Sequence, residues 1–261
     1  MKATQAKARM YVTSAAFKTM HRYEAGGPEE DFYLFHNIGV FKDCAFQLSD
    51  CREYVKWMEA RTNDEMLEAY RFHKQQTQLI LHSREFLNSD LRMVFKENFH
   101  SLYLAVALKV YPDAIFVHTY RNPSTTVASL CSVRENFKLL TYEKDDVDLK
   151  QIGREVLGNS FCHGGIQMMN YRKHNPELEH RFIDIAYDDL ATSPMDVVKK
   201  IYDHFGLELT DEVTEKMEAY VKENPKNKYG CHEYDLNRYH LTKDEVLKHF
   251  KDYVEEYKIP C

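Results

Sequence analysis

The chain has 261 residues, a length that fits one large domain with a substantial buried core. Its 41 acidic and 35 basic side chains give a formal net charge of −6, and no block of basic residues stands out. Nucleic-acid binding needs a broad positive surface, so the composition argues against it, whereas a small anionic ligand needs only a few local cations.

The cysteines and histidines show no metal-ligand spacing, so no metal site is expected. The six cysteines are read as buried or free thiols: Cys44, Cys51, Cys131, Cys162, Cys231 and Cys261. Such thiols are typical of a reducing compartment, which predicts a cytoplasmic location. No apolar run is long enough to cross a bilayer, so no integral membrane segment is expected. A longer form that is membrane-anchored or lumenal stays open.

Helices dominate the predicted structure of the first half. One helix begins near Ser49, and a longer one follows Asn63, which is expected to act as its N-cap. The longer helix places these residues near one face: Met66, Leu67, Tyr70, His73, Thr77 and Ile80. Residues 91–96 are a short strand candidate, and residues 100–111 have helical length and composition.

Residues 114–120 carry the strongest strand signal, since β-branched and aromatic residues follow a Pro-Asp turn. One helix is predicted from Pro123, another over residues 149–171, and a third strand over residues 181–187. Strands separated by helices predict a helix-rich, three-layer α/β fold with a central parallel sheet. Ligands of such sheets bind beyond the carboxyl ends of the strands.

The C-terminal third carries clear helix boundaries. Ser193 and Pro194 predict an N-cap and a first turn, and Gly206 predicts the end of that helix. Thr242 with a glutamate three positions later predicts a capping box. The helix that follows the capping box is expected to continue to Tyr257.

A strand, an arginine and a capped helix follow one another in the sequence RNPSTTVAS, which starts at Arg121. Asn122 is predicted to cap the helix that Pro123 starts. The first-turn amides of Ser124 and Thr125 would then stay free for an anion. Arg121 stands beside them, and its planar fork suits bidentate contact with phosphate. The junction therefore predicts a phosphate site.

Thr125, Ser129 and Ser132 recur at helical spacing and predict a hydroxyl stripe opposite a buried apolar face. A helix that lies between a core and a polar ligand needs such a pattern. The alternative is that the hydroxyls face water and that Arg121 forms a surface ion pair. These physical features alone favour neither interpretation.

The same nine residues resemble the 3′-phosphate motif of PAPS-dependent sulfotransferases, in which an arginine and a later serine hold the 3′-phosphate of 3′-phosphoadenosine 5′-phosphosulfate (PAPS). Three further segments resemble that family in order and spacing: FKENFHSL, YDDLATSPMDVVKKIYDHFGL and YGCHEYDLNRYHLTKDEV. The resemblance runs from Pro28 to Ile259. It implies a P-loop NTPase-like fold and PAPS as the sulfonate donor, without a metal.

The resemblance also implies roles for individual residues. Six of them would contact the cofactor: Arg121, Thr125, Ser129, Tyr187, Lys228 and Gly230. Arg121 and Ser129 would hold the 3′-phosphate, Tyr187 would lie near the adenine, and Lys228 and Gly230 would close over the phosphate. Tyr187 is otherwise a packing residue, and Lys228 and Gly230 are otherwise part of a polar loop.

Three residues at the end of the 91–96 segment are candidates for catalysis. His100 would be the general base that accepts the proton of the acceptor hydroxyl. Lys96 would stabilise the oxygens of the transferring sulfonate, and Glu97 is a second candidate base. The plainer interpretations are a histidine with a structural hydrogen bond, a solvated lysine and an exposed glutamate at a helix start.

One family feature is not found in the sequence. Sulfotransferases carry, after their first strand, a phosphate loop whose amides and basic residue hold the 5′-phosphosulfate, and no Gly-x-x-x-x-Gly-Lys or similar loop occurs here. We therefore expect one sulfotransferase-like domain over residues 1–261 that lacks its first strand and phosphate loop. Residues 1–27 are expected to form a loosely attached segment. The chain is either a shortened product or a protein that has lost part of its site.

Two functions follow from these features. The first is a sulfotransferase that moves sulfonate from PAPS to a hydroxyl or amine of a small-molecule, lipid or carbohydrate acceptor, with a homodimer left open. The second is a non-catalytic, sulfotransferase-like nucleotide-binding or regulatory protein, which the missing loop supports. A kinase-like transferase would need a phosphate loop and a magnesium-binding acid, and the sequence shows neither.

Overall fold

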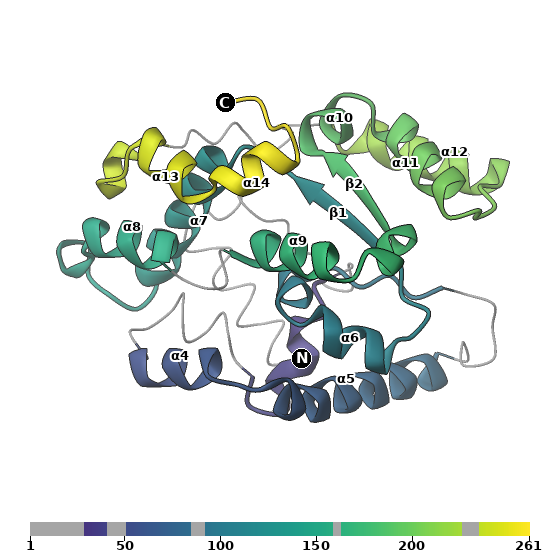
Figure 1. The fold of residues 1–261 in the computed structure, drawn as a ribbon, viewed down its shortest axis with the longest axis horizontal. Helices are drawn as coiled ribbons and strands as arrows, with labels where there is room; N and C mark the ends of the chain where they lie inside the picture. The colour runs from purple at the N-terminus through teal and green to yellow at the C-terminus, as the bar shows by residue number, and fades with distance from the viewer. Residues whose placement is uncertain (1–28, 41–50, 85–91, 159–162, 226–234) are drawn as a thin grey trace.

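The computed structural model describes residues 29–40, 51–84, 92–158, 163–225 and 235–261. Within these ranges the chain is mainly helical and contains a two-stranded parallel sheet (Figure 1). Its strands are β1 (Phe116–Tyr120) and β2 (Phe182–Ala186), and Tyr120 lies opposite Ala186 in the register. This pairing confirms the predicted parallel sheet.

The helices of the N-terminal half pack around a hydrophobic cluster of their own, below the sheet in Figure 1. They are α3 (Phe32–His36), α4 (Arg52–Glu59), α5 (Asn63–Ser83), the 3₁₀ helix η2 (Asn98–Leu102) and α6 (Leu104–Val110). Phe35, Tyr70 and Phe99 are among the largest fully buried side chains of this cluster. Their rings meet edge to face, with the centroid of Phe35 5.1 Å from that of Tyr70 and 5.5 Å from that of Phe99.

The predicted N-cap of α5 is wrong by one residue. Thr62 is the cap, because its hydroxyl accepts the Glu65 N–H while the Glu65 carboxylate accepts the Thr62 N–H. This capping box satisfies two donors at once, which a cap at Asn63 does not offer.

The strand predicted over residues 91–96 is also wrong for the part that the structure describes, since residues 92–97 have no regular secondary structure. The Lys96 N–H donates to the Asp31 carboxylate, with 3.0 Å between N and Oδ1, rather than to a neighbouring strand. The Asp31 side chain therefore accepts the backbone N–H that would pair with a neighbouring strand in a sheet.

The second half surrounds the sheet with longer helices. They are α7 (Pro123–Lys138), α8 (Leu149–Gly158), α9 (Gly164–His174), α10 (Tyr187–Thr192), α11 (Pro194–His204), α12 (Asp211–Glu223), α13 (Lys243–His249) and α14 (Lys251–Glu256), with 3₁₀ turns η3 (Lys144–Asp146), η5 (Pro176–Arg181) and η6 (Asn237–Tyr239). The helix predicted from Pro123 is confirmed as α7.

The single helix predicted over residues 149–171 is two helices, α8 and α9. Three glycines lie where the first ends and the second begins, and glycine costs about 1 kcal/mol in a helix interior. A Cβ on Gly164 would lie 2.2 Å from the Ser101 hydroxyl oxygen, and one on Gly165 would lie 2.8 Å from the Tyr253 ring. Gly164 and Gly165 therefore allow close packing, which apolar periodicity does not reveal.

Alternate side chains of β2 face opposite layers. Ile183 and Ile185 pack against Val197 of α11, whereas Phe182 packs against Met168 of α9. The Phe116 ring stacks on Phe182 with 4.8 Å between the centroids. The predicted three-layer arrangement is thus present at β2, with α11 on one face and α9 on the other.

The helix boundaries predicted for the C-terminal third are mostly confirmed. Pro194 is the first residue of α11, although the Ser193 side chain makes no capping hydrogen bond, and Gly206 adopts a left-handed φ of +61° after the helix end. The capping box of Thr242 is present. The last predicted helix is divided, because α13 ends at His249 and α14 starts at Lys251.

The end of α14 reverses through Lys258, whose φ is 49°. The Lys258 N–H donates to the Glu255 carbonyl at 3.3 Å and the Ile259 N–H donates to the Val254 carbonyl at 3.0 Å. This pair of bonds is a Schellman motif with lysine where glycine is preferred.

Replacing Lys258 with glycine is expected to raise the free energy of unfolding by about 0.5 kcal/mol, because a left-handed conformation is strained for a residue with a Cβ. Urea denaturation measures the change. The same substitution at Lys248 inside α13 is the control and is expected to lower stability by about 1 kcal/mol. A loss of stability for Lys258→Gly would contradict the assignment of the motif.

Several expectations are only partly covered by the described residues. The structure describes Cys51, Cys131 and Cys261, and no disulfide bond forms among these three cysteines. No helix in the described ranges combines the length and apolar character of a membrane span. The loosely attached segment 1–27 lies outside these ranges, and the single-domain organisation stays a prediction.

Candidate functional site

Asn122 holds the junction between β1 and α7. Its Oδ1 accepts the Ser124 N–H at 2.9 Å, and its backbone carbonyl accepts the Thr125 N–H at 3.1 Å. The predicted cap is confirmed, but the prediction that the amides of Ser124 and Thr125 stay free is wrong, because the cap uses both. An anion at this junction would depend on the helix dipole and on side chains instead.

Arg121 and Tyr187 lie against each other at the carboxyl ends of the two strands. The Arg121 Cζ is 4.3 Å from the centroid of the Tyr187 ring. The parallel register explains this, because each residue directly follows one of the last paired residues, Tyr120 and Ala186. Arg121 forms no ion pair with any described residue, so the surface ion pair considered above is not observed there. Its N–H donors are therefore available to an anion.

Hydroxyl groups follow Arg121 along α7. Thr125 and Ser129 are half-buried, and their side chains make no hydrogen bond within the described ranges. The Ser124 Oγ is buried without a partner there. An unsatisfied buried polar group costs about 1 to 3 kcal/mol, which a ligand oxygen would recover. Ser132, the third residue of the predicted stripe, is only 7% exposed and belongs to the interior.

These features fit the terminal phosphate and base of an adenosine nucleotide. The guanidinium supplies a bidentate donor, the unpartnered Ser124 hydroxyl supplies a further polar contact, and the Tyr187 ring supplies an apolar face. Two of the predicted cofactor residues, Arg121 and Tyr187, are thus in contact. Lys228 and Gly230 lie outside the described residues.

Lys96 and Glu97 have protein partners. The Lys96 Nζ forms an ion pair with Glu30, and its side chain is 74% exposed. Exposed ion pairs are weak, so this ammonium can exchange Glu30 for a ligand oxygen. The Glu97 Oε1 accepts the Phe99 N–H at 2.9 Å and caps η2. Glu97 therefore has a structural role as a helix cap, and its role as a second candidate base stays a prediction.

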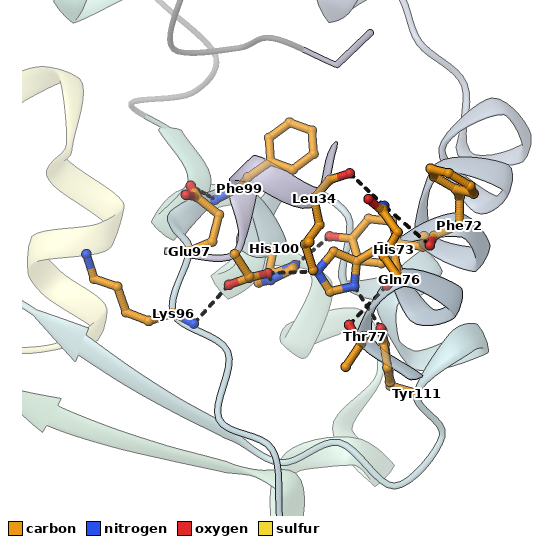
Figure 2. Close-up of polar contacts among 12 residues, drawn as sticks. Leu34, Phe72, His73, Gln76, Thr77, Lys96, Glu97, Phe99, His100 and Tyr111 are labelled. Carbon is orange, nitrogen blue, oxygen red and sulfur yellow. Dashed lines mark hydrogen bonds and ion pairs between the residues drawn. The ribbon is translucent and has the colours of Figure 1, made fainter. Parts of the chain in front are cut away.

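Both ring nitrogens of His100 are engaged (Figure 2). The Nδ1 lies 2.8 Å from the Tyr70 hydroxyl, and the Nε2 lies 2.8 Å from the Asp31 Oδ2. The side chain is 17% exposed. A neutral histidine has one basic lone pair, so His100 can accept a proton from an acceptor only after one of these bonds opens. The role of His100 as general base stays a prediction, and it requires that one of these hydrogen bonds opens.

A second histidine binds the same carboxylate (Figure 2). The His73 Nε2 lies 3.0 Å from the Asp31 Oδ2, and the His73 Nδ1 lies 2.7 Å from the Tyr111 hydroxyl. We call these five residues the Asp31 network: Asp31, Tyr70, His73, His100 and Tyr111. It joins the start of α3, helix α5, η2 and the end of α6.

The pKa shifts indicate that Asp31 is ionised and that both tyrosines of the Asp31 network are protonated. Burial alone would raise the pKa of Asp31, but hydrogen bonds from His100 and His73 outweigh it and hold that pKa well below its usual value. Burial raises the pKa of Tyr111 to about 12 and that of Tyr70 well above its usual value. The carboxylate is therefore the acceptor for both Nε2 atoms, and in the neutral form of each histidine the Nδ1 is left to accept from a tyrosine hydroxyl.

Sequence reasoning did not identify Asp31 or His73 as functional neighbours of His100. The signal for His73 was present, because a polar residue occurs on the apolar face predicted for α5, and its side chain is fully buried. Asp31 gave no such signal, since it lies 69 positions from His100 and only the fold brings the two together.

Comparison with known proteins decides the family. Residues 2–211 match the sequence profile described as "Sulfotransferase family". The chain belongs to the sulfotransferase family. The predicted resemblance is thereby confirmed, and the four motifs quoted above were sufficient to find it.

Curated relatives of this sulfotransferase family member include the omega-hydroxy-beta-dihydromenaquinone-9 sulfotransferases Stf3 of Mycobacterium bovis and Mycobacterium tuberculosis. Each is 22% identical over 170 residues, which cover 63% of this chain and 40% of the relative. The chain spans less than two thirds of the length of these relatives.

Two solved sulfotransferases share the fold. STF9 from Mycobacterium avium superposes with a TM-score of 0.79 at 21% identity, over 99% of this chain and 64% of that one. STF1 from Mycobacterium tuberculosis H37Rv gives 0.74 at 23% identity, over 96% and 62%. These similarities confirm the predicted helix-rich, P-loop-like α/β fold. The lack of a first strand and phosphate loop stays a prediction from the sequence.

No group of three or more metal-ligating side chains occurs in the part of this sulfotransferase family member that the structure describes.

Proposed function

We propose that this chain binds PAPS and transfers its sulfonate group to a hydroxyl or amine of a small-molecule, lipid or carbohydrate acceptor. One observation carries this proposal: Arg121 lies on the Tyr187 ring without an ion pair among the described residues, at the carboxyl end of a parallel sheet. Membership of the sulfotransferase family supports a sulfonate donor of this kind.

In the proposed reaction an acceptor oxygen or nitrogen attacks sulfur, and the bond from sulfur to the bridging phosphate oxygen breaks. The acceptor gives up a proton, and 3′-phosphoadenosine 5′-phosphate leaves. Arg121, Thr125, Ser129 and Tyr187 would bind the nucleotide, with Lys228 and Gly230 as further contacts. Lys96 would leave Glu30 to stabilise the sulfonate oxygens, and His100, or else Glu97, would take the proton.

Among the acceptor classes, a lipid hydroxyl has some support. The relative Stf3 is named as a sulfotransferase of omega-hydroxy-beta-dihydromenaquinone-9, which is a lipid with a hydroxyl group. At 22% identity this supports the class of acceptor only. A cytoplasmic location is part of the same proposal, based on the described cysteines, which form no disulfide bond with one another.

A thermal-shift experiment tests the nucleotide site. We expect 3′-phosphoadenosine 5′-phosphate to raise the melting temperature, since a ligand that binds only the native state stabilises it. Adenosine 5′-monophosphate, which lacks the 3′-phosphate, is the control and should give a much smaller shift. Equal shifts, or none with either nucleotide, would refute the site.

A transfer assay separates the enzyme from a non-catalytic nucleotide-binding protein. PAPS labelled in its sulfonate group is incubated with the protein and with a hydroxylated quinone, a sugar or an amine. Label in one acceptor supports the enzyme. Nucleotide binding without transfer to any of the three would favour the regulatory alternative.

A further inference from the structure

The end of the chain follows β1 and the residues after it, and contacts every second one of them. The three contacts are His118 with Tyr253, Tyr120 with Tyr257, and Asn122 with Pro260. We call residues 253–260 the C-terminal splint. In Figure 1, α14, which begins this segment, lies beside the tip of β1.

The first contact fixes the splint to the sheet. The Tyr253 hydroxyl lies 2.9 Å from the His118 Nε2, and the His118 Nδ1 lies 2.7 Å from the Asp184 Oδ1. Arg172 holds that carboxylate with two bonds of 2.8 Å. Burial opposes ionisation of Asp184, but the bonds from His118 and Arg172 lower its pKa to about 2. Asp184 therefore accepts from the Nδ1, and in the neutral form of His118 the Nε2 is left to accept from the Tyr253 hydroxyl.

The second contact lies one residue before Arg121. The rings of Tyr120 and Tyr257 stack with 5.3 Å between their centroids and 27° between their planes. Beyond Tyr257 the Schellman turn at Lys258 reverses the chain, and Ile259 enters the hydrophobic cluster that contains Val127 of α7. The splint is thus anchored on both sides of its turn.

The third contact reaches the helix cap. The Asn122 Nδ2 donates to the Pro260 carbonyl at 2.9 Å, while the Oδ1 of the same amide accepts the Ser124 N–H. An amide whose nitrogen is held in this way must present its oxygen to α7. The splint therefore orients the residue that caps the helix and that directly follows Arg121.

We propose that the C-terminal splint is a positioning device for the nucleotide site. The splint holds Tyr120, the last residue of β1, and Asn122, the cap of α7, while Arg121 between them contacts Tyr187. It fixes the direction in which the guanidinium leaves the chain toward a terminal phosphate. This positioning role rests on the proposed PAPS site.

Asn122→Ser tests the third contact. Serine caps a helix about as well as asparagine but is too short to donate to Pro260. We expect calorimetry to show severalfold weaker binding of 3′-phosphoadenosine 5′-phosphate, because the residue at position 122 would no longer be held beside Arg121. The lost intramolecular hydrogen bond should also lower the free energy of unfolding by the modest amount typical of one such bond. The control is Thr210→Ser, the same kind of exchange at the cap of α12, which should leave the affinity unchanged.

Tyr257 provides a second test that does not alter the cap. Tyr257→Phe keeps the stacked ring and should bind nucleotide as the unchanged protein does, whereas Tyr257→Leu should bind severalfold more weakly. Tyr257→Phe and Tyr257→Leu together test the positioning role of the C-terminal splint even if Asn122→Ser does not fold.

The outcomes separate the two proposals. If the unchanged protein binds the nucleotide, and Arg121→Ala loses affinity while Asn122→Ser and Tyr257→Leu do not, the splint has no positioning role but the site stands. If Arg121→Ala binds as well as the unchanged protein, or if nothing binds, both proposals are overturned. Equal losses for Tyr257→Phe and Tyr257→Leu would also overturn the role of the stack.

Discussion

Arg121→Ala is expected to weaken the binding of 3′-phosphoadenosine 5′-phosphate by about 1.5 to 3 kcal/mol, the range for a hydrogen bond to a charged group. This corresponds to roughly 10- to 150-fold in Kd. The reason is that Arg121 lies on the Tyr187 ring but has no ion pair among the described residues, so its N–H donors are available to a phosphate. Isothermal titration calorimetry measures the change.

Two variants control this result. Arg121→Lys keeps the charge but loses the planar fork, so we expect an intermediate loss of affinity. Arg71→Ala removes an arginine from an exposed ion pair on α5 and should leave the affinity unchanged. An equal loss of affinity for Arg71→Ala and Arg121→Ala would mean that binding depends only on the net charge of the protein. The assigned site would then be wrong.

The elements around this site were predictable because their signals are local. A β-branched run, a proline at the first helical position and a capping asparagine all act within a few residues, and β1 and α7 match them closely. Family resemblance assigned Arg121 and Tyr187 to the cofactor, but it did not predict their contact with each other. The parallel register then supplied its physical reason.

The failed predictions have both local and distant causes. The amides of Ser124 and Thr125 are used by the predicted cap, Asn122, itself, and the cap of α5 depends on Thr62 and Glu65, which are three residues apart. Both outcomes follow from capping rules that act within one turn. Residues 92–96 have strand-like composition, but their backbone meets the Asp31 carboxylate instead of a strand. That outcome cannot be read from spacing, because a tertiary contact overrides the local preference.

The two histidines of the Asp31 network show a further limit. The sequence placed His100 at the rim of the sheet and His73 on a buried helix face, but it gave no reason to connect them. One carboxylate connects them, and together with the Tyr70 hydroxyl it engages both nitrogens of the candidate base. The Asp31 network thus holds these helices together. It also limits His100 as a base, because one of its hydrogen bonds must open before it can accept a proton.

The largest effect on stability is expected from Asp31. Asp31→Ala should lower the free energy of unfolding by about 3 to 5 kcal/mol, the range for removing one partner of a buried charged group. The His73 Nε2–H would lose its acceptor in a fully buried site, and the His100 Nε2–H and the Lys96 N–H would lose theirs. Guanidinium denaturation at neutral pH measures the change.

Glu30→Ala is the matched control, because Glu30 is the neighbouring carboxylate and its partner, Lys96, is exposed. Removing it should cost at most about 1 kcal/mol.

The contribution of Asp31 to the free energy of unfolding should also depend on pH in one direction. The fold holds the pKa of Asp31 below its usual value, so the unfolded chain takes up a proton first as the pH falls. The difference between the unchanged protein and Asp31→Ala should therefore persist above the ordinary carboxyl pKa of about 3.9 and shrink at lower pH. A difference that grows in acid, or an equal loss for Glu30→Ala, would show that the Asp31 network does not hold these helices together.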